Sequence, residues 1–146
     1  MANRIQYGTR NADGTITEYH IRRVPSWHDA QQFAHVSRQP TVAVFRVVRE
    51  GPFSVNHVGE AVTDWCDLPE NAAIQFGIDS GGTVRESRHD NLTCLPDLHD
   101  LTGEGDPHGH AHGGGGRIVY RAVTLHPQYD RIAAALTNWT PLYPAS

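Results

Sequence analysis

The amino-acid sequence predicts an α+β domain, in which a largely antiparallel sheet of roughly five to seven strands carries two helices. Residues 41–49 and 117–125 are almost continuously apolar, as is typical of central strands covered on both faces. Two other segments, at about 26–37 and 127–138, place apolar residues at helical spacing. The chain of 146 residues is long enough to bury a core, and we expect a single domain over 1–146.

The first third of the chain predicts two short strands followed by a helix. Residues 5–7 and 15–24 are rich in strand formers, and the turn residues 11–14 separate them. The helix of about 26–37 begins at Ser26, because a serine side chain there can accept from the free amides of the first turn. Its apolar stripe consists of Trp27, Ala30, Phe33 and Ala34.

The second half of the chain predicts a hairpin and a second helix. Residues 74–78 alternate between apolar and polar, which predicts a half-buried strand, and the turn at 80–82 leads into a polar edge strand over 83–88. The helix of about 127–138 starts at a proline and has apolar residues at i, i+3, i+4 and i+7: Tyr129, Ile132, Ala133 and Leu136. We expect both helices on one face of the sheet, which leaves the other face for a partner or subunit.

The two predicted central strands are similar to each other. Residues 44–48 and 119–123 both follow the order valine, aromatic, arginine, small or apolar residue, valine. Five positions are too few to establish a duplication, since buried strands converge on such patterns.

The charges of the chain favour neither a nucleic-acid partner nor a membrane. All 12 basic residues are arginines, which fits a GC-rich genome, and they are scattered along a chain of net charge −4. Nucleic-acid binding requires a basic stripe, and a membrane helix requires about 20 consecutive apolar residues. The sequence has neither pattern, and its first residues lack a signal peptide. We therefore expect a soluble protein with no nucleic-acid or membrane partner.

A histidine- and glycine-rich loop over 99–116 is the main candidate for a metal site. His108, His110 and His112 alternate, so an extended backbone would direct all three imidazoles to one face. Together with His99, they form a candidate zinc site, although the surrounding glycines oppose ordering. The sequence thus predicts either no cofactor or a zinc ion. Further candidate ligands are Cys94 and Asp97, and the candidates for carboxylates that orient the imidazoles are Asp100, Glu104 and Asp106.

A second polar cluster lies around Cys66. A nucleophilic pair of Cys66 with His57 or His99 is conceivable, but no nucleophile motif surrounds the cysteine, and no catalytic residue is predicted. Cys66 and Cys94 are expected to be free thiols. The same region carries clustered carboxylates at Glu60, Asp64, Asp67 and Glu70.

The first third of the chain also carries a resemblance. The motif Tyr7-Gly8-Thr9-Arg10, the turn Asp13-Gly14, Asp29-Ala30 and a strand at 42–48 with Arg46 resemble the opening of small uncharacterised proteins from actinobacteria and their phages. The lysine-free composition fits that source. The group has no common activity, but the resemblance implies the cytoplasm of a bacterial host or a phage particle.

These observations favour a non-enzymatic interaction or assembly protein. We expect a small subunit or accessory protein of a phage or actinobacterial complex, which binds a protein partner or forms a homo-oligomer. One alternative is a small zinc-dependent enzyme, a hydrolase, that uses the segment from His99 to His112. Another is an immunity-type inhibitor that binds one protein target through its acidic face, formed by Glu60, Asp64, Asp67 and Glu70.

Overall fold

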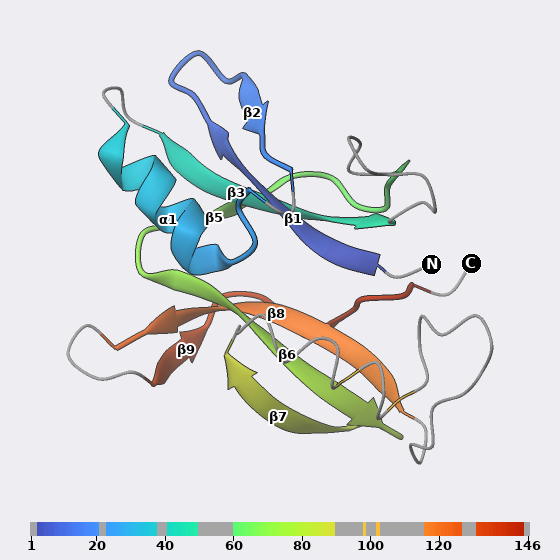
Figure 1. Ribbon diagram of the computed structural model, residues 1–146. Coiled ribbons are helices and arrows are strands. Elements are labelled where there is room, and N and C mark those ends of the chain that lie inside the picture. The colour runs from blue at the N-terminus through green and yellow to red at the C-terminus, as the bar shows by residue number, and fades with distance from the viewer. Residues whose placement is uncertain are drawn as a thin grey trace. The chain divides into compact units, whose positions relative to one another are not determined.

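The computed structural model of the protein is mostly β (Figure 1). It describes residues 3–20, 23–37, 41–49, 60–89, 98, 102, 116–126 and 131–144. These residues form two curled antiparallel sheets and one helix, so the predicted α+β fold with two helices is wrong. The chain divides into two compact units, Arg4–Ala72 and Ala73–Ser146, the second of which also includes Met1–Asn3. These units are called the first and the second repeat.

The first repeat is a five-stranded sheet with a helix. The sheet has the order β2-β1-β3-β4, and β5 pairs with β3 beside β4. β3 is the predicted central strand, and its residues from Ala43 to Val48 are buried except for Arg46. The elements are β1 (Asn3–Arg10), β2 (Ile16–Glu18), α1 (Trp27–Val36), β3 (Val42–Arg49), β4 (Glu60–Ala61) and β5 (Cys66–Leu68).

Helix α1 confirms the first predicted helix. Ser26 is its N-cap, and the Ser26 hydroxyl accepts from the backbone N–H of Asp29 at 3.3 Å. Asp29 places a negative charge in the first turn, where the helix dipole favours it. Ala30 is fully buried on the face of the helix that packs against β3.

The second repeat is again a five-stranded sheet. Its order is β10-β8-β6-β7, and β9 pairs with β8 beside β10. β6 differs from the half-buried strand expected at 74–78, because every residue from Ala72 to Ile78 is buried. The strands are β6 (Ala72–Ser80), β7 (Thr83–His89), β8 (Arg117–Leu125), β9 (Ile132–Ala135) and β10 (Thr140–Pro141).

The helix predicted at 127–138 is absent from the described residues 131–138, which contain β9. Its expected apolar face is not buried: Ala133 is exposed and Leu136 is 46% exposed. The backbone instead forms a hairpin with β8, in which Ala135 lies opposite Val123. Ladder pairing to a buried strand has therefore overridden the helical propensity of the alanines.

The two units repeat the same strand plan, β2-β1-β3 with β4 and β5 in one and β7-β6-β8 with β9 and β10 in the other. The register agrees as well. Phe45 pairs with Cys66 in the first unit, as Tyr120 pairs with Thr140 in the second. Val48 likewise pairs with Ala61 as Val123 pairs with Ala135. The similarity of the two central strands thus extends to the whole sheet, and the chain contains a structural repeat.

Candidate functional site

An arginine on the central strand is held between a glutamine and a tryptophan in the first repeat. Arg46 Nε donates to the Oε1 of Gln6 on β1 at 2.8 Å, and Arg46 Nη2 pairs with the carboxylate of Glu18 on β2. The guanidinium lies over the ring of Trp65, 4.3 Å from its centroid. The Trp65 ring in turn lies against Gly8, where an added Cβ would be 3.3 Å from Trp65 Cη2.

The second repeat contains the same arginine–tryptophan cluster. Arg121 Nε donates to Gln75 Oε1 at 2.8 Å, and the Arg121 guanidinium lies 4.3 Å from the ring centroid of Trp139. An added Cβ at Gly77 would be 3.2 Å from Trp139 Cη2. A threonine two residues before each tryptophan accepts from the central strand, since Thr63 Oγ1 accepts from Val47 N and Thr137 Oγ1 from Ala122 N.

Both clusters have a structural role. The side chain of Arg46 is only 17% exposed, and its Nε and Nη2 atoms are engaged by Gln6 and Glu18. Gln6 is fully buried and Gln75 is 1% exposed, so each requires an internal partner. A set of side chains that recurs in both repeats with the same partners is part of the fold, and a specific function has to be sought where the repeats differ.

Comparisons of the chain with protein-family models, with curated proteins and with solved structures found no match. The two repeats remain informative about each other, because each shows which residues the shared fold tolerates at a given position.

The described residues of the two repeats differ in an acidic edge, which we define as Glu60, Asp64, Asp67 and Glu70. All four are exposed, on β4, on β5 and in the turns beside them. Asp67 pairs with Arg10 at 3.0 Å, whereas the other three make no ion pair with a described residue. Counted from Trp65 and Trp139, the equivalent residues of the second repeat are all uncharged: Ala134, Asn138, Pro141 and Pro144.

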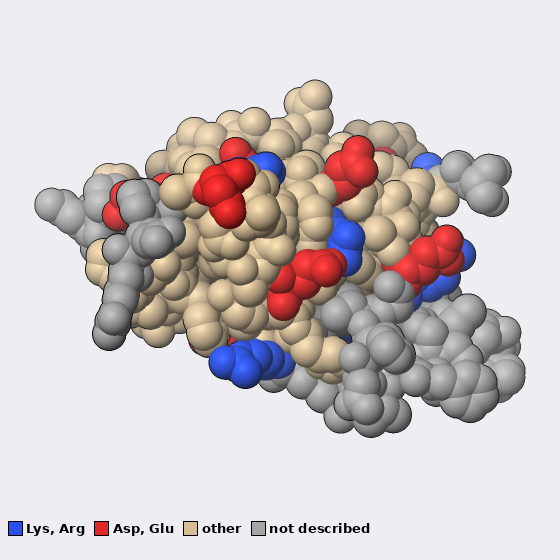
Figure 2. Space-filling model, turned by 90° about the horizontal axis from the view of Figure 1, so that it is seen from above, with Lys and Arg blue, Asp and Glu red and all other residues tan. Residues whose placement is uncertain are grey.

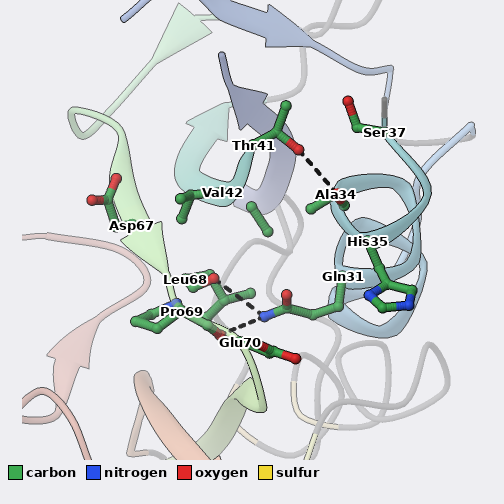
Figure 3. A pocket seen from close by; sticks show the side chains of 11 residues that line it. Gln31, Ala34, His35, Ser37, Thr41, Val42, Asp67, Leu68, Pro69 and Glu70 are labelled. Atoms are coloured by element: carbon green, nitrogen blue, oxygen red, sulfur yellow. Dashed lines mark hydrogen bonds between the residues drawn. The ribbon is translucent and has the colours of Figure 1, made fainter. Parts of the chain in front are cut away.

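A groove lies beside the acidic edge, between α1, β3 and β5 (Figure 3). It has a volume of about 680 Å³. Gln31 reaches from α1 across one end of the groove, and its Nε2 donates to the carbonyl oxygens of Leu68, Pro69 and Ala72 at 3.2, 2.7 and 3.2 Å. Asp67 and Glu70 belong both to the groove lining and to the acidic edge. The groove therefore combines an apolar surface with carboxylates.

The candidate zinc ligands His99, His108, His110 and His112 lie outside the described residues, and so does His57. Within the described part of the chain, no group of three or more His, Cys, Asp or Glu side chains is placed to hold a metal ion. Cys66 is a free, exposed thiol on β5. The zinc site and the pairing of Cys66 with His57 or His99 thus remain predictions from the sequence.

Surface charge is mixed on the face seen in Figure 2, where acidic and arginine side chains lie among uncharged residues. The described residues of that face show no continuous basic patch. No helix among the described residues is long and apolar enough to cross a membrane.

The arginine–tryptophan clusters were not predicted, although the sequence contains a signal for them. Ile5-Gln6-Tyr7-Gly8 and Ile74-Gln75-Phe76-Gly77 align at every position, because both read isoleucine, glutamine, an aromatic residue and glycine in that order. Each precedes one of the two central strands whose similarity the sequence does show. The two matches together would have indicated the repeat.

Proposed function

We propose that this chain is a non-enzymatic protein-binding module that contacts a basic surface of one partner protein through its acidic edge. The proposal is supported by one observation above all: four exposed carboxylates line this edge in the first repeat, and the second repeat has none at the equivalent positions. The fold does not need these charges, because the same strand plan forms with Ala134 and Asn138 in place of Glu60 and Asp64.

The charge of the edge favours a different protein over a second copy of this chain. Two acidic edges facing each other would repel, whereas a basic surface would gain from electrostatic steering and pairing. Glu60, Asp64 and Glu70 are suited to this contact because no described cation neutralises them. An accessory protein or an inhibitor of one target fits this surface better than a self-assembling subunit.

The test uses the residues of the second repeat as replacements. The partner is first captured from the organism that encodes the chain, then purified and mixed with the wild type in a calorimetric titration. The variant Glu60→Ala/Asp64→Asn is expected to bind at least about tenfold more weakly, mostly through slower association. A higher salt concentration screens charges more strongly, so it should weaken partner binding by the wild type more than by the variant.

A matched control makes the reverse exchange at the equivalent positions of the second repeat. Ala134→Glu/Asn138→Asp adds two charges at the equivalent positions and is expected to leave partner binding unchanged. If this control strengthens binding as much as the first variant weakens it, the effect comes from net charge and not from the acidic edge. Equal affinity of the wild type and Glu60→Ala/Asp64→Asn would contradict the proposal outright.

A further inference from the structure

The groove between α1 and β5 has an apolar floor and acceptors at its rim. Ala34, Val42, Leu68 and Pro69 supply the apolar part, and Val42 is 40% exposed although it begins a central strand. The carboxylates of Asp67 and Glu70 stand on the β5 side. Such a surface suits a long side chain with an apolar stem and a polar head.

The polar groups of the groove determine which charge the polar head of such a side chain should carry. Gln31 uses its Nε2 to bind three backbone carbonyls, and its carbonyl oxygen points away from them in Figure 3. Pro69, one of the three, precedes Glu70, so the Gln31 amide and the Glu70 residue lie at the same end of the groove. An amide oxygen and carboxylates accept hydrogen bonds from a cation and repel an anion.

We propose that this groove receives an arginine or lysine side chain of the partner protein. The inference deepens the proposed function and rests on it, since a protein partner is assumed. The aliphatic stem would lie on Val42 and Pro69, and the cationic head would bind Glu70 and the Gln31 oxygen. Asp67, which already pairs with Arg10, would add negative potential at the rim.

At the described positions, the second repeat differs from the first in residues that line the groove. The residue equivalent to Val42 is Arg117, which is exposed, and those equivalent to Asp67 and Glu70 are Pro141 and Pro144. A cation therefore occupies the position of Val42, and uncharged prolines occupy the positions of the two carboxylates. The fold tolerates this exchange, so Val42→Arg is a suitable blocking variant that the strand plan accommodates.

The test is an NMR titration of the full chain, labelled with ¹⁵N, with an acetylated and amidated pentapeptide that carries arginine between two valines. The matched probe has citrulline, a neutral isostere, in place of arginine. The arginine peptide is expected to bind about tenfold more tightly than the citrulline peptide, because the charged hydrogen bonds to Glu70 are lost with citrulline. The amide signals of Gln31, Val42 and Glu70 should shift.

Two variants then locate the site. Glu70→Gln should remove most of the preference for arginine while keeping the weaker citrulline binding, and Val42→Arg should weaken both peptides. Equal affinity for the two peptides, shifts confined to other residues, or no shifts at millimolar peptide would each overturn the inference. These residues differ from Glu60 and Asp64, so failure of the groove and failure of the acidic edge are separately visible.

Discussion

The guanidinium carbon of Arg46 lies 4.3 Å from the ring centroid of Trp65. Arg121 and Trp139 adopt the same arrangement at the same distance in the second repeat. A cation over an indole ring is attracted by the negative face of the ring, and here each arginine also holds a buried glutamine oxygen. The two clusters should therefore contribute similarly to the stability of their repeats.

Removing either arginine tests this equivalence. Arg46→Met and Arg121→Met each leave a buried glutamine oxygen without its donor, so each should lower the free energy of unfolding by about 2 kcal/mol. Urea denaturation measures the change. Arg85→Met, at an exposed position on β7, is the control and should cost less than about 0.5 kcal/mol. Similar values for Arg46→Met and Arg85→Met would contradict a structural role for the cluster.

The glycines beneath the tryptophans should resist substitution. A Cβ at Gly8 would lie 2.6 Å from the carbonyl oxygen of Thr17, and one at Gly77 would lie 2.9 Å from Val84 Cγ1. Gly8→Ala and Gly77→Ala should each cost about 1–3 kcal/mol, as overpacking does elsewhere. Thermal unfolding followed by circular dichroism measures the loss.

Substitution of Gly14 shows the cost of backbone strain without steric crowding. It has a φ of +88° but open space around its Cβ position, so Gly14→Ala should cost only about 1 kcal/mol. If Gly8→Ala is no more harmful than Gly14→Ala, Trp65 and β2 do not pack against Gly8 as described.

A substitution in β9 should change the stability of the protein in the opposite direction from the same substitution in a helix. Ala134 is exposed and lies opposite Thr124. Ala134→Thr should therefore stabilise the protein by about 0.5 kcal/mol, because threonine favours strands and pairs well across them. In a helix the same change would destabilise by about 0.5 kcal/mol. Chemical denaturation of both proteins gives the sign directly.

The turn between β1 and β2 lowers the pKa of Asp13. The Thr15 hydroxyl donates to Asp13 Oδ1 at 2.6 Å and the Thr15 backbone N–H at 3.0 Å, and both stabilise the charged carboxylate. The stabilisation is present above the pKa of the unfolded chain and is lost as the pH falls through the folded pKa. Thr15→Val should raise the pKa of Asp13 toward its ordinary value. An NMR titration of the carboxyl carbon measures this, and an unchanged pKa would contradict it.

Several elements follow from local sequence alone. The helix after Ser26 has its N-cap and a buried alanine, and both central strands stand where their apolar runs predict them. The segment after Leu125 was mispredicted because spacing alone cannot tell whether an apolar residue is buried. Leu136 satisfies the helical spacing but is exposed, and pairing with β8 decided the outcome.

The candidate site was predicted only in part. Glu60, Asp64, Asp67 and Glu70 are visible as a cluster of carboxylates, and the structure places all of them on one edge. The groove could not be predicted, because it depends on Gln31 reaching backbone carbonyls that lie 37 to 41 residues away. The functional interpretation of the acidic edge also depends on comparison with the second repeat, which shows that the fold forms without these charges.

Asn3, at the start of β1, depends on residues that are synthesised near the other end of the chain. Its side-chain Nδ2 donates to the carbonyl of Leu142 at 2.8 Å, and its backbone N–H to the hydroxyl of Tyr143 at 2.9 Å. Asn3 is only 2% exposed, so both donors need these partners once the strand is buried. As long as Leu142 and Tyr143 have not left the ribosome, both donors of Asn3 lack these partners. The burial of Asn3 must therefore wait until Leu142 and Tyr143 have been synthesised, however early the central strands pair.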